Sequence, residues 1–138
     1  MMNTPRATVV ADASAIVALL SEATADAEWA AETVLPAALV APRLLPFEVG
    51  HALRGIQRAG KLDATSATLA HVELQSYPIQ LWPHTPLAKR AWELRGNLTY
   101  YDACYVALAE LLDAPLVTLD RRLAQAPGPR CVVLTPPE

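Results

Sequence analysis

Four acidic residues each lie where a short apolar run or a loop changes to a helical pattern: Asp12, Glu48, Asp102 and Asp120. If the strands involved are parallel neighbours, these carboxylates converge, because the carboxyl ends of parallel strands meet at one edge of a sheet. Several carboxylates in one pocket repel one another unless they share protons or bind a divalent cation. Hard oxygen donors without a group of His or Cys residues select Mg²⁺ or Mn²⁺ rather than zinc. The four acids therefore predict a Mg²⁺ site, with Mn²⁺ as a possible substitute.

A carboxylate-held Mg²⁺ favours phosphoryl chemistry, because the ion neutralises a phosphate oxygen and lowers the pKa of a bound water. Hydrolysis of a phosphodiester is the reaction that such a site predicts. Phosphoryl transfer to an aspartate, as in receiver-type domains, would also require a Lys on the strand that follows Thr118. Residues 116–134 contain no Lys, so we favour hydrolysis.

Helix capping offers a simpler explanation for the same acids, because free backbone N–H groups favour carboxylates at helix N-termini. Asp120 could be a cap alone, Asp102 could form a capping box with Thr99, and Asp12 could share capping with Ser14. Capping does not require the acids to gather at one edge of a sheet. Their joint placement therefore favours a common acidic site.

Short apolar runs alternate with helical patterns along the chain, which predicts a parallel sheet covered by helices. Strands are predicted at residues 8–11, 39–41, 79–82, 116–119 and 131–134. Helices are predicted at residues 15–20, with Ser14 as the cap, and at 26–34, 46–59, 63–74, 86–95, 101–112 and 121–126. We expect residues 1–138 to form a single domain, a three-layer α/β/α sandwich with a mostly parallel central sheet.

The composition excludes several classes of protein. Hydrophobic residues make up 53% of the chain and charged residues 18%, which suits buried strands flanked by helices rather than a disordered segment. The formal net charge of −3 gives no basic field for non-specific nucleic-acid binding. A metal nuclease is still compatible with this charge, because a bound cation would make the local potential attractive to phosphate.

The N-terminal apolar run is too short for a signal peptide or a membrane span and is broken by Asp12, so a cytoplasmic protein is expected. Cys104 and Cys131 are isolated, and we expect both to be free, buried thiols. His51 lies about one helical turn beyond Glu48 and could touch the site, although a surface or packing role is simpler. The three tryptophans are interpreted as core or interface anchors rather than as base-stacking platforms: Trp29, Trp82 and Trp92.

The order of the motifs along the chain resembles that of PIN-domain proteins, and specifically that of VapC toxins of type II toxin–antitoxin pairs. The resemblance spans essentially the whole chain. Its motifs are VADASA at 10–15, PRLLPFEV at 42–49, LR at 94–95 with YDACYVALAE at 101–110, and TLDRRL at 118–123. In this order the motifs are specific for the family.

This resemblance implies a Mg²⁺- or Mn²⁺-dependent endoribonuclease that cleaves structured cellular RNA, such as tRNA or rRNA, and thereby arrests translation. It implies that the four acids are the catalytic and metal-binding residues. Ser14 and Thr118 match the family's small hydroxyl positions and would orient a carboxylate or a water. The alternative is a catalytically silent PIN-like module that binds a protein partner or RNA.

The resemblance also implies a VapB antitoxin, a homodimer and a toxin–antitoxin hetero-oligomer. The C-terminal segment of the antitoxin would wrap the toxin and place an Arg among the acids, where a guanidinium fork can bind carboxylates. The helix that carries Trp92 is a candidate for the dimer contact. Contacts to RNA would come from local basic residues, with these candidates: Arg43, Arg54, Arg58, Lys61, Lys89, Arg90, Arg95, Arg121 and Arg122.

Overall fold

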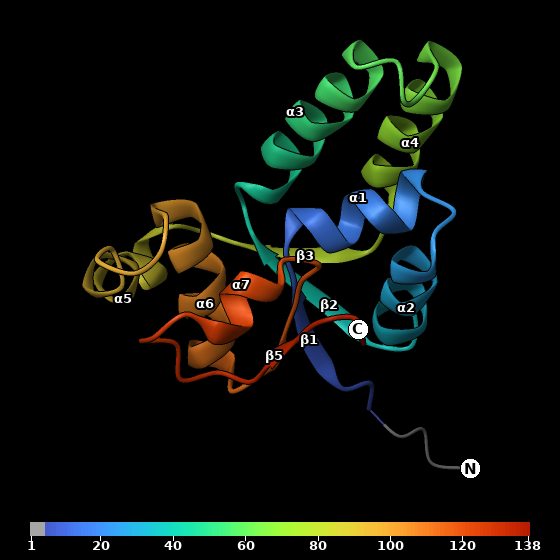
Figure 1. Ribbon diagram of the computed structural model, residues 1–138. Helices are drawn as coiled ribbons and strands as arrows, with labels where there is room; N and C mark the ends of the chain where they lie inside the picture. Colours follow the sequence, from blue (N-terminus) through green and yellow to red (C-terminus); the bar gives the residue numbers. More distant parts are fainter. Residues whose placement is uncertain (1–4) are drawn as a thin grey trace.

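A five-stranded parallel sheet forms the centre of the structure, a computed structural model that describes residues 5–138 (Figure 1). The strands are β1 (Thr8–Ala11), β2 (Ala38–Pro42), β3 (Ile79–Trp82), β4 (Leu116–Val117) and β5 (Val133–Leu134). Their order is β3-β2-β1-β4-β5, and each neighbouring pair is parallel. The predicted α/β class with a parallel sheet is therefore confirmed. Residues 1–4, part of the segment predicted not to be a signal peptide, lie outside the described residues.

Helices cover both sides of this sheet. They are α1 (Ala13–Ser21), α2 (Ala25–Val34), α3 (Leu45–Arg58), α4 (Ala64–Ser76), α5 (Ala88–Glu93), α6 (Tyr100–Leu112) and α7 (Arg121–Gln125), with a 3₁₀ turn at Thr85–Leu87 before α5. Figure 1 shows α1 and α2 on one side of the sheet, α5 and α6 on the other, and α3 and α4 projecting as a hairpin. In residues 5–138, no helix combines the length and apolar character needed to cross a bilayer.

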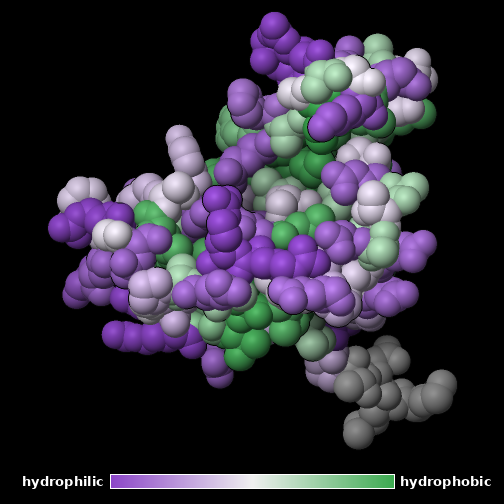
Figure 2. Space-filling view, in the orientation of Figure 1, coloured by the Kyte–Doolittle hydropathy of each residue, from purple (hydrophilic) through white to green (hydrophobic). Residues whose placement is uncertain are grey.

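The core contains residues of the sheet and of the helices on both of its sides, and α6 contributes a continuous stretch from Ala103 to Ala109 that is entirely buried. The prediction of a helix that is apolar nearly all round is thus confirmed, and its burial anchors the acid in its first turn. Cys104 is buried as predicted, whereas Cys131 is only partly buried; both are free thiols. Polar side chains cover most of the face seen in Figure 2, with smaller apolar areas between them.

Several predicted boundaries differ from the structure for local reasons. The first helix begins at Ala13 and not at Ala15, because Asp12, rather than Ser14, caps it. The backbone N–H of Leu119 donates to the Ser14 hydroxyl instead of to another strand, so β4 ends at Val117. β5 pairs only with the two residues of β4 and is equally short. The helix predicted at 86–95 consists of the 3₁₀ turn followed by α5.

Candidate active site

The predicted acids lie at the carboxyl edge of the sheet, where the strand order changes direction. β2 and β3 lie on one side of β1, and β4 and β5 on the other. Asp12 follows β1, Glu48 lies in the first turn of α3, Asp102 lies in the first turn of α6, and Asp120 caps α7. Ligand sites of open parallel sheets form at such a switch point, so the fold itself favours a site here.

Asp12 is the most firmly held of these acids, with its side chain nearly inaccessible to solvent. Its Oδ1 accepts hydrogen bonds from the Ser14 hydroxyl at 2.6 Å and from the Ala15 backbone N–H at 3.1 Å. Its Oδ2 accepts one from the Thr118 hydroxyl at 2.5 Å. An ionised carboxylate has about four lone-pair positions, so roughly one is left for a ligand.

Ser14 and Thr118 connect α1 to the segment after β4. The Ser14 hydroxyl accepts a hydrogen bond from the backbone N–H of Leu119 at 3.0 Å. Thr118 is fully buried, and its hydroxyl accepts one from the backbone N–H of Asp120 at 3.0 Å. The two hydroxyl oxygens lie 3.3 Å apart. These two residues, predicted to orient a carboxylate, therefore fix Asp12 and also the backbone that carries Asp120.

Glu48 is held from the neighbouring helix by a residue that the sequence analysis did not select. The buried Tyr105 donates its hydroxyl hydrogen bond to Glu48 Oε1 at 2.7 Å. Tyr105 follows Asp102 by three residues, so the two share one face of α6. From this three-residue spacing, the sequence could have identified Tyr105 as a neighbour of the site.

Asp102 and Asp120 both make local contacts at the starts of their helices. Thr99 caps α6 by accepting a hydrogen bond from the backbone N–H of Asp102 at 3.1 Å, which is one of the two hydrogen bonds of the predicted capping box. Asp120 caps α7 and forms an ion pair with Arg122, whose Nε lies 3.2 Å from Oδ1. Because the Arg122 side chain is 93% exposed, this pair is open to solvent and can exchange partners readily.

The electrostatics show which acids are neighbours. Burial raises the pKa of Asp12, and the charge of Asp102 raises it further against the hydrogen bonds that lower it. Burial likewise raises the pKa of Glu48, with added repulsion from Asp102 and Asp12. The pKa of Asp102 is raised by burial and then by Asp120. By contrast, the hydrogen bond from Arg122 lowers the pKa of Asp120. Asp102 is thus the common neighbour of the other three acids.

The donors fit a hard divalent cation by type and by electrostatics, because three of the carboxyls repel one another and a cation would relieve that repulsion. They are not a preformed ligand set. Within residues 5–138, no three Asp, Glu, His or Cys side chains are placed so that together they could hold a metal ion. Glu48 turns to Tyr105 and Asp120 to Arg122, so a bound ion would require some of these side chains to turn.

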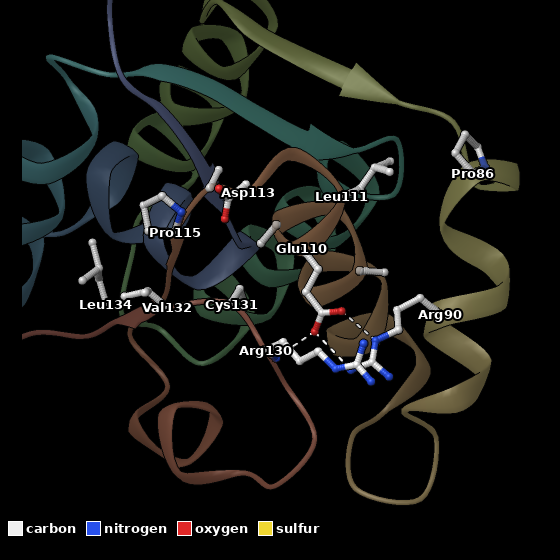
Figure 3. A pocket seen from close by; sticks show the side chains of 13 residues that line it. Pro86, Arg90, Glu110, Leu111, Asp113, Pro115, Arg130, Cys131, Val132 and Leu134 are labelled. Carbon is white, nitrogen blue, oxygen red and sulfur yellow. Dashed lines mark hydrogen bonds and ion pairs between the residues drawn. The ribbon is translucent and has the colours of Figure 1, made fainter.

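One cavity borders the acidic edge, and a larger one lies away from it. A cavity of about 450 Å³ is lined by Ser14, Glu48 and His51 among others, so His51 adjoins the site as considered from the sequence. The larger cavity of about 760 Å³ lies near the other end of α6. There Glu110 points toward Arg90 and Arg130, accepting from Arg90 Nε at 2.6 Å (Figure 3). Arg90, a candidate for RNA contact, is therefore partly exposed and already paired with Glu110.

Comparisons with known proteins agree with this fold. The PIN-domain family model matches residues 9–129. Ribonuclease VapC1 of Mycobacterium tuberculosis is 44% identical over 128 residues, covering 90% of this chain and 94% of that protein. The crystal structure of PAE2754 from Pyrobaculum aerophilum superposes with a TM-score of 0.67 at 28% identity, covering 92% of this chain and 83% of its own. VapBC2 from Rickettsia felis, bound to a promoter DNA fragment, has a TM-score of 0.65 at 10% identity and coverages of 93% and 98%, which shows the fold alone.

The fold, the site and the relatives together place the chain in one class of proteins. These are endoribonucleases built on a parallel sheet, with acidic residues where the strand order changes direction. The chain belongs to the PIN-domain family and, within it, to the VapC ribonucleases of toxin–antitoxin systems. The family membership that was predicted from the order of the motifs is thus confirmed. Nucleases of this family are in general metal-dependent.

Proposed function

We propose that this ribonuclease toxin requires Mg²⁺, with Mn²⁺ as a substitute, and hydrolyses phosphodiester bonds in a structured cellular RNA such as tRNA or rRNA. The observation that carries the proposal is the position of Asp12. It is buried, held through three hydrogen bonds, and adjacent to other carboxyls whose pKa values are raised. Such an arrangement costs folding stability and is explained by a cation that the acids bind.

Each residue of the site would have its own role in the hydrolysis. Asp12, Asp102, Glu48 and Asp120 would hold the ion, which supplies charge neutralisation at the phosphate and a more acidic water. Glu48 has one oxygen, Oε1, engaged by Tyr105, which would leave Oε2 for the ion. Ser14 and Thr118 would keep Asp12 in one rotamer, so that its remaining lone pair stays directed at the ion.

The macromolecular partners proposed for this chain follow from its fold and its acidic site. VapBC2 from Rickettsia felis and FitAcB from Neisseria gonorrhoeae share the fold, and an antitoxin of VapB type is the partner that we propose for this chain. An arginine of the antitoxin would pair with the acids when the toxin is inhibited. We also propose a homodimer within a toxin–antitoxin hetero-oligomer. The exposed Trp92 of α5, with the Arg95 guanidinium 4.3 Å from its ring centroid, is a candidate contact for that dimer.

Asp12→Asn tests the proposal, because it keeps the shape of the side chain and removes the charge. Asp63→Asn is the matched control, since Asp63 caps α4 in the same way but is exposed and distant in the fold. With Mg²⁺, the purified wild type and the control should cleave cellular RNA, and Asp12→Asn should be slower by more than about 100-fold. Sequencing of RNA ends after induction names the target. Equal cleavage by Asp12→Asn would contradict the proposal and favour the catalytically silent module.

A further inference from the structure

A small apolar pocket of about 210 Å³ lies beside the acids, where β2 and β3 end and α6 begins. Pro42 and Trp82, the last residues of these two strands, line it. Tyr100 and Tyr101 line it from the first turn of α6. The catalytic scheme proposed above uses none of these four residues.

Residues that line this pocket flank Asp102 on both sides along the chain. Tyr101 immediately precedes Asp102 in the chain, and Cys104, two residues further along α6, also lines the pocket. A phosphodiester bound at the acids would therefore place its neighbouring nucleotides within reach of the pocket.

Aromatic rings make up much of the wall: Trp82, His84, Tyr100 and Tyr101. His84 and Tyr100 are fixed to each other, with 2.6 Å between His84 Nε2 and the Tyr100 hydroxyl. Tyr101 remains 62% exposed, so its ring is accessible to a ligand beside the candidate active site. Unpaired bases stack on such rings, and their stacking tolerates any sequence.

Trp82 contributes its indole ring to the pocket. It packs against the core, as the sequence analysis predicted, and it also lines the pocket. Its indole N–H is buried and forms no hydrogen bond within residues 5–138. The N–H has almost no accessible surface and the lining of the pocket is almost entirely apolar, so Trp82 offers a base its ring rather than this donor.

Arg43 supplies complementary charge at the same place. It follows β2 directly and lines the pocket, and its backbone N–H donates to the Trp82 carbonyl at 2.9 Å. Its side chain is exposed and forms no ion pair with a residue of the described chain. A guanidinium beside an aromatic pocket suits a base with an attached phosphate better than it suits an aliphatic side chain of a protein partner.

We infer that this pocket binds an unpaired nucleobase of the RNA next to the scissile phosphate, an inference that rests on the proposed RNA-cleaving function. The pocket would hold the strand by stacking while Arg43 contacts the adjacent phosphate. Tyr101 and Trp82 are accordingly substrate-binding residues. Trp82 was interpreted from the sequence only as a core or interface anchor, and the structure gives it this second role.

Nucleotide titration by NMR tests the pocket without any need for cleavage. The chain has three tryptophans, so ¹⁵N-labelled protein gives three indole N–H signals, and Trp82→Phe identifies the signal of Trp82. The probes are AMP, GMP, CMP and UMP, with ribose 5-phosphate as the control without a base, all in EDTA. At least one nucleotide should shift the Trp82 signal saturably, whereas the signals of Trp29 and Trp92 should stay in place.

The variants make the assignment specific. Tyr101→Ala should weaken nucleotide binding by roughly 5- to 150-fold, the loss expected for one stacked base. Phe47→Ala is the matched control, because Phe47 is also exposed and also precedes an acid of the site, but it does not line the pocket. Since Tyr101 is mostly exposed, its removal should leave the fold intact, which the two other indole signals report.

The outcomes separate this inference from the proposed function. Absence of a saturable shift, or an equal shift with ribose 5-phosphate, would overturn the base pocket even if the wild type cleaves RNA. A Trp82 signal that responds to the antitoxin but to no nucleotide would assign the pocket to protein binding and would also overturn it. A base-dependent shift in a protein that cleaves no RNA would support the pocket and contradict the nuclease.

Discussion

At the scale of single residues, the site depends on hydroxyl groups as much as on carboxylates. Asp12 is buried and charged, and such a group is tolerated only with hydrogen-bond partners. Ser14 and Thr118 provide two of its three partners from segments more than one hundred positions apart in the sequence. The acids alone therefore do not define the site, because two uncharged residues determine where the central acid points.

Thr118→Val should test this dependence, because valine keeps the shape of the side chain and removes the hydroxyl. Asp12 Oδ2 and the Asp120 N–H both lose their partner, so the free energy of unfolding should fall by about 1–3 kcal/mol. RNA cleavage should fall by roughly 10- to 100-fold, as for other groups that orient a metal ligand. Denaturant unfolding and a cleavage assay measure the two effects.

Thr68→Val is the control for this substitution. The Thr68 hydroxyl is exposed and bonds only to the Ala64 carbonyl of its own helix, at 2.8 Å. Its loss should change stability by no more than about 0.5 kcal/mol and leave cleavage unchanged. If Thr118→Val behaved like this control, Thr118 would not position Asp12.

Tyr105→Phe addresses the protonation of Glu48. The hydrogen bond from Tyr105 lowers the pKa of Glu48 against the larger effect of burial, which raises it. Removal of the hydroxyl should therefore raise this pKa further, and the acid limb of the pH profile of kcat/KM should move to higher pH. Tyr77→Phe, a partly buried tyrosine away from the acids, should leave the profile in place. A profile unchanged in Tyr105→Phe would show that Glu48 does not titrate in the rate-limiting step.

At the scale of secondary-structure elements, the sequence predicted the helices and the strands well but not the contacts between them. Hydrophobic patterns and turn residues identify each element because they act locally. The pairing of Tyr105 with Glu48, fifty-seven positions apart, depends on how α6 packs beside α3, which no local pattern specifies. The same holds for the Ser14 cap: tertiary contact with Leu119 recruited its hydroxyl and left the capping of α1 to Asp12.

The N-terminus of α6 provides a prediction at this scale. Thr99→Ala removes the cap of α6, and Thr24→Ala removes that of α2, where Thr24 accepts from the Ala27 N–H at the same 3.1 Å. Each substitution should reduce the free energy of unfolding by about 1 kcal/mol. Only Thr99→Ala should also slow cleavage, because the backbone N–H that it frees belongs to Asp102. Equal cleavage by the two variants would mean that the cap does not position Asp102.

At the scale of the whole molecule, the parallel topology gathers residues from the entire chain at one edge of the sheet. The switch in strand order on the two sides of β1 creates the crevice, and the helices that follow the strands supply acids to it. The sequence predicted this edge through the position of each acid after a strand or at the start of a helix. It could not predict that the acids are neighbours without being a ready ligand set, because side-chain rotamers depend on tertiary hydrogen bonds.

The gathered acids should make the stability of the molecule depend on pH and on metal together. The pKa values of Asp12, Glu48 and Asp102 are raised in the folded state, so between the unfolded and the folded pKa the folded state binds more protons. In EDTA, these acids should therefore lower the free energy of unfolding as the pH rises from about 4 through their raised pKa values. Asp120, whose pKa is lowered, acts in the opposite direction and loses its stabilising effect as the pH falls.

Comparison of the wild type with Asp12→Asn separates the effect of the acids whose pKa values are raised from the opposite effect of Asp120. In EDTA at neutral pH, Asp12→Asn should melt at a higher temperature than the wild type, because the most buried of the repelling charges is gone. Addition of Mg²⁺ at 100 times its Kd should stabilise the wild type by about 2.7 kcal/mol, with a much smaller effect on the variant. Calorimetric melts across pH, with and without the metal, measure both differences. If the melting temperature of the wild type did not change on addition of Mg²⁺, the four acids would act as separate helix caps.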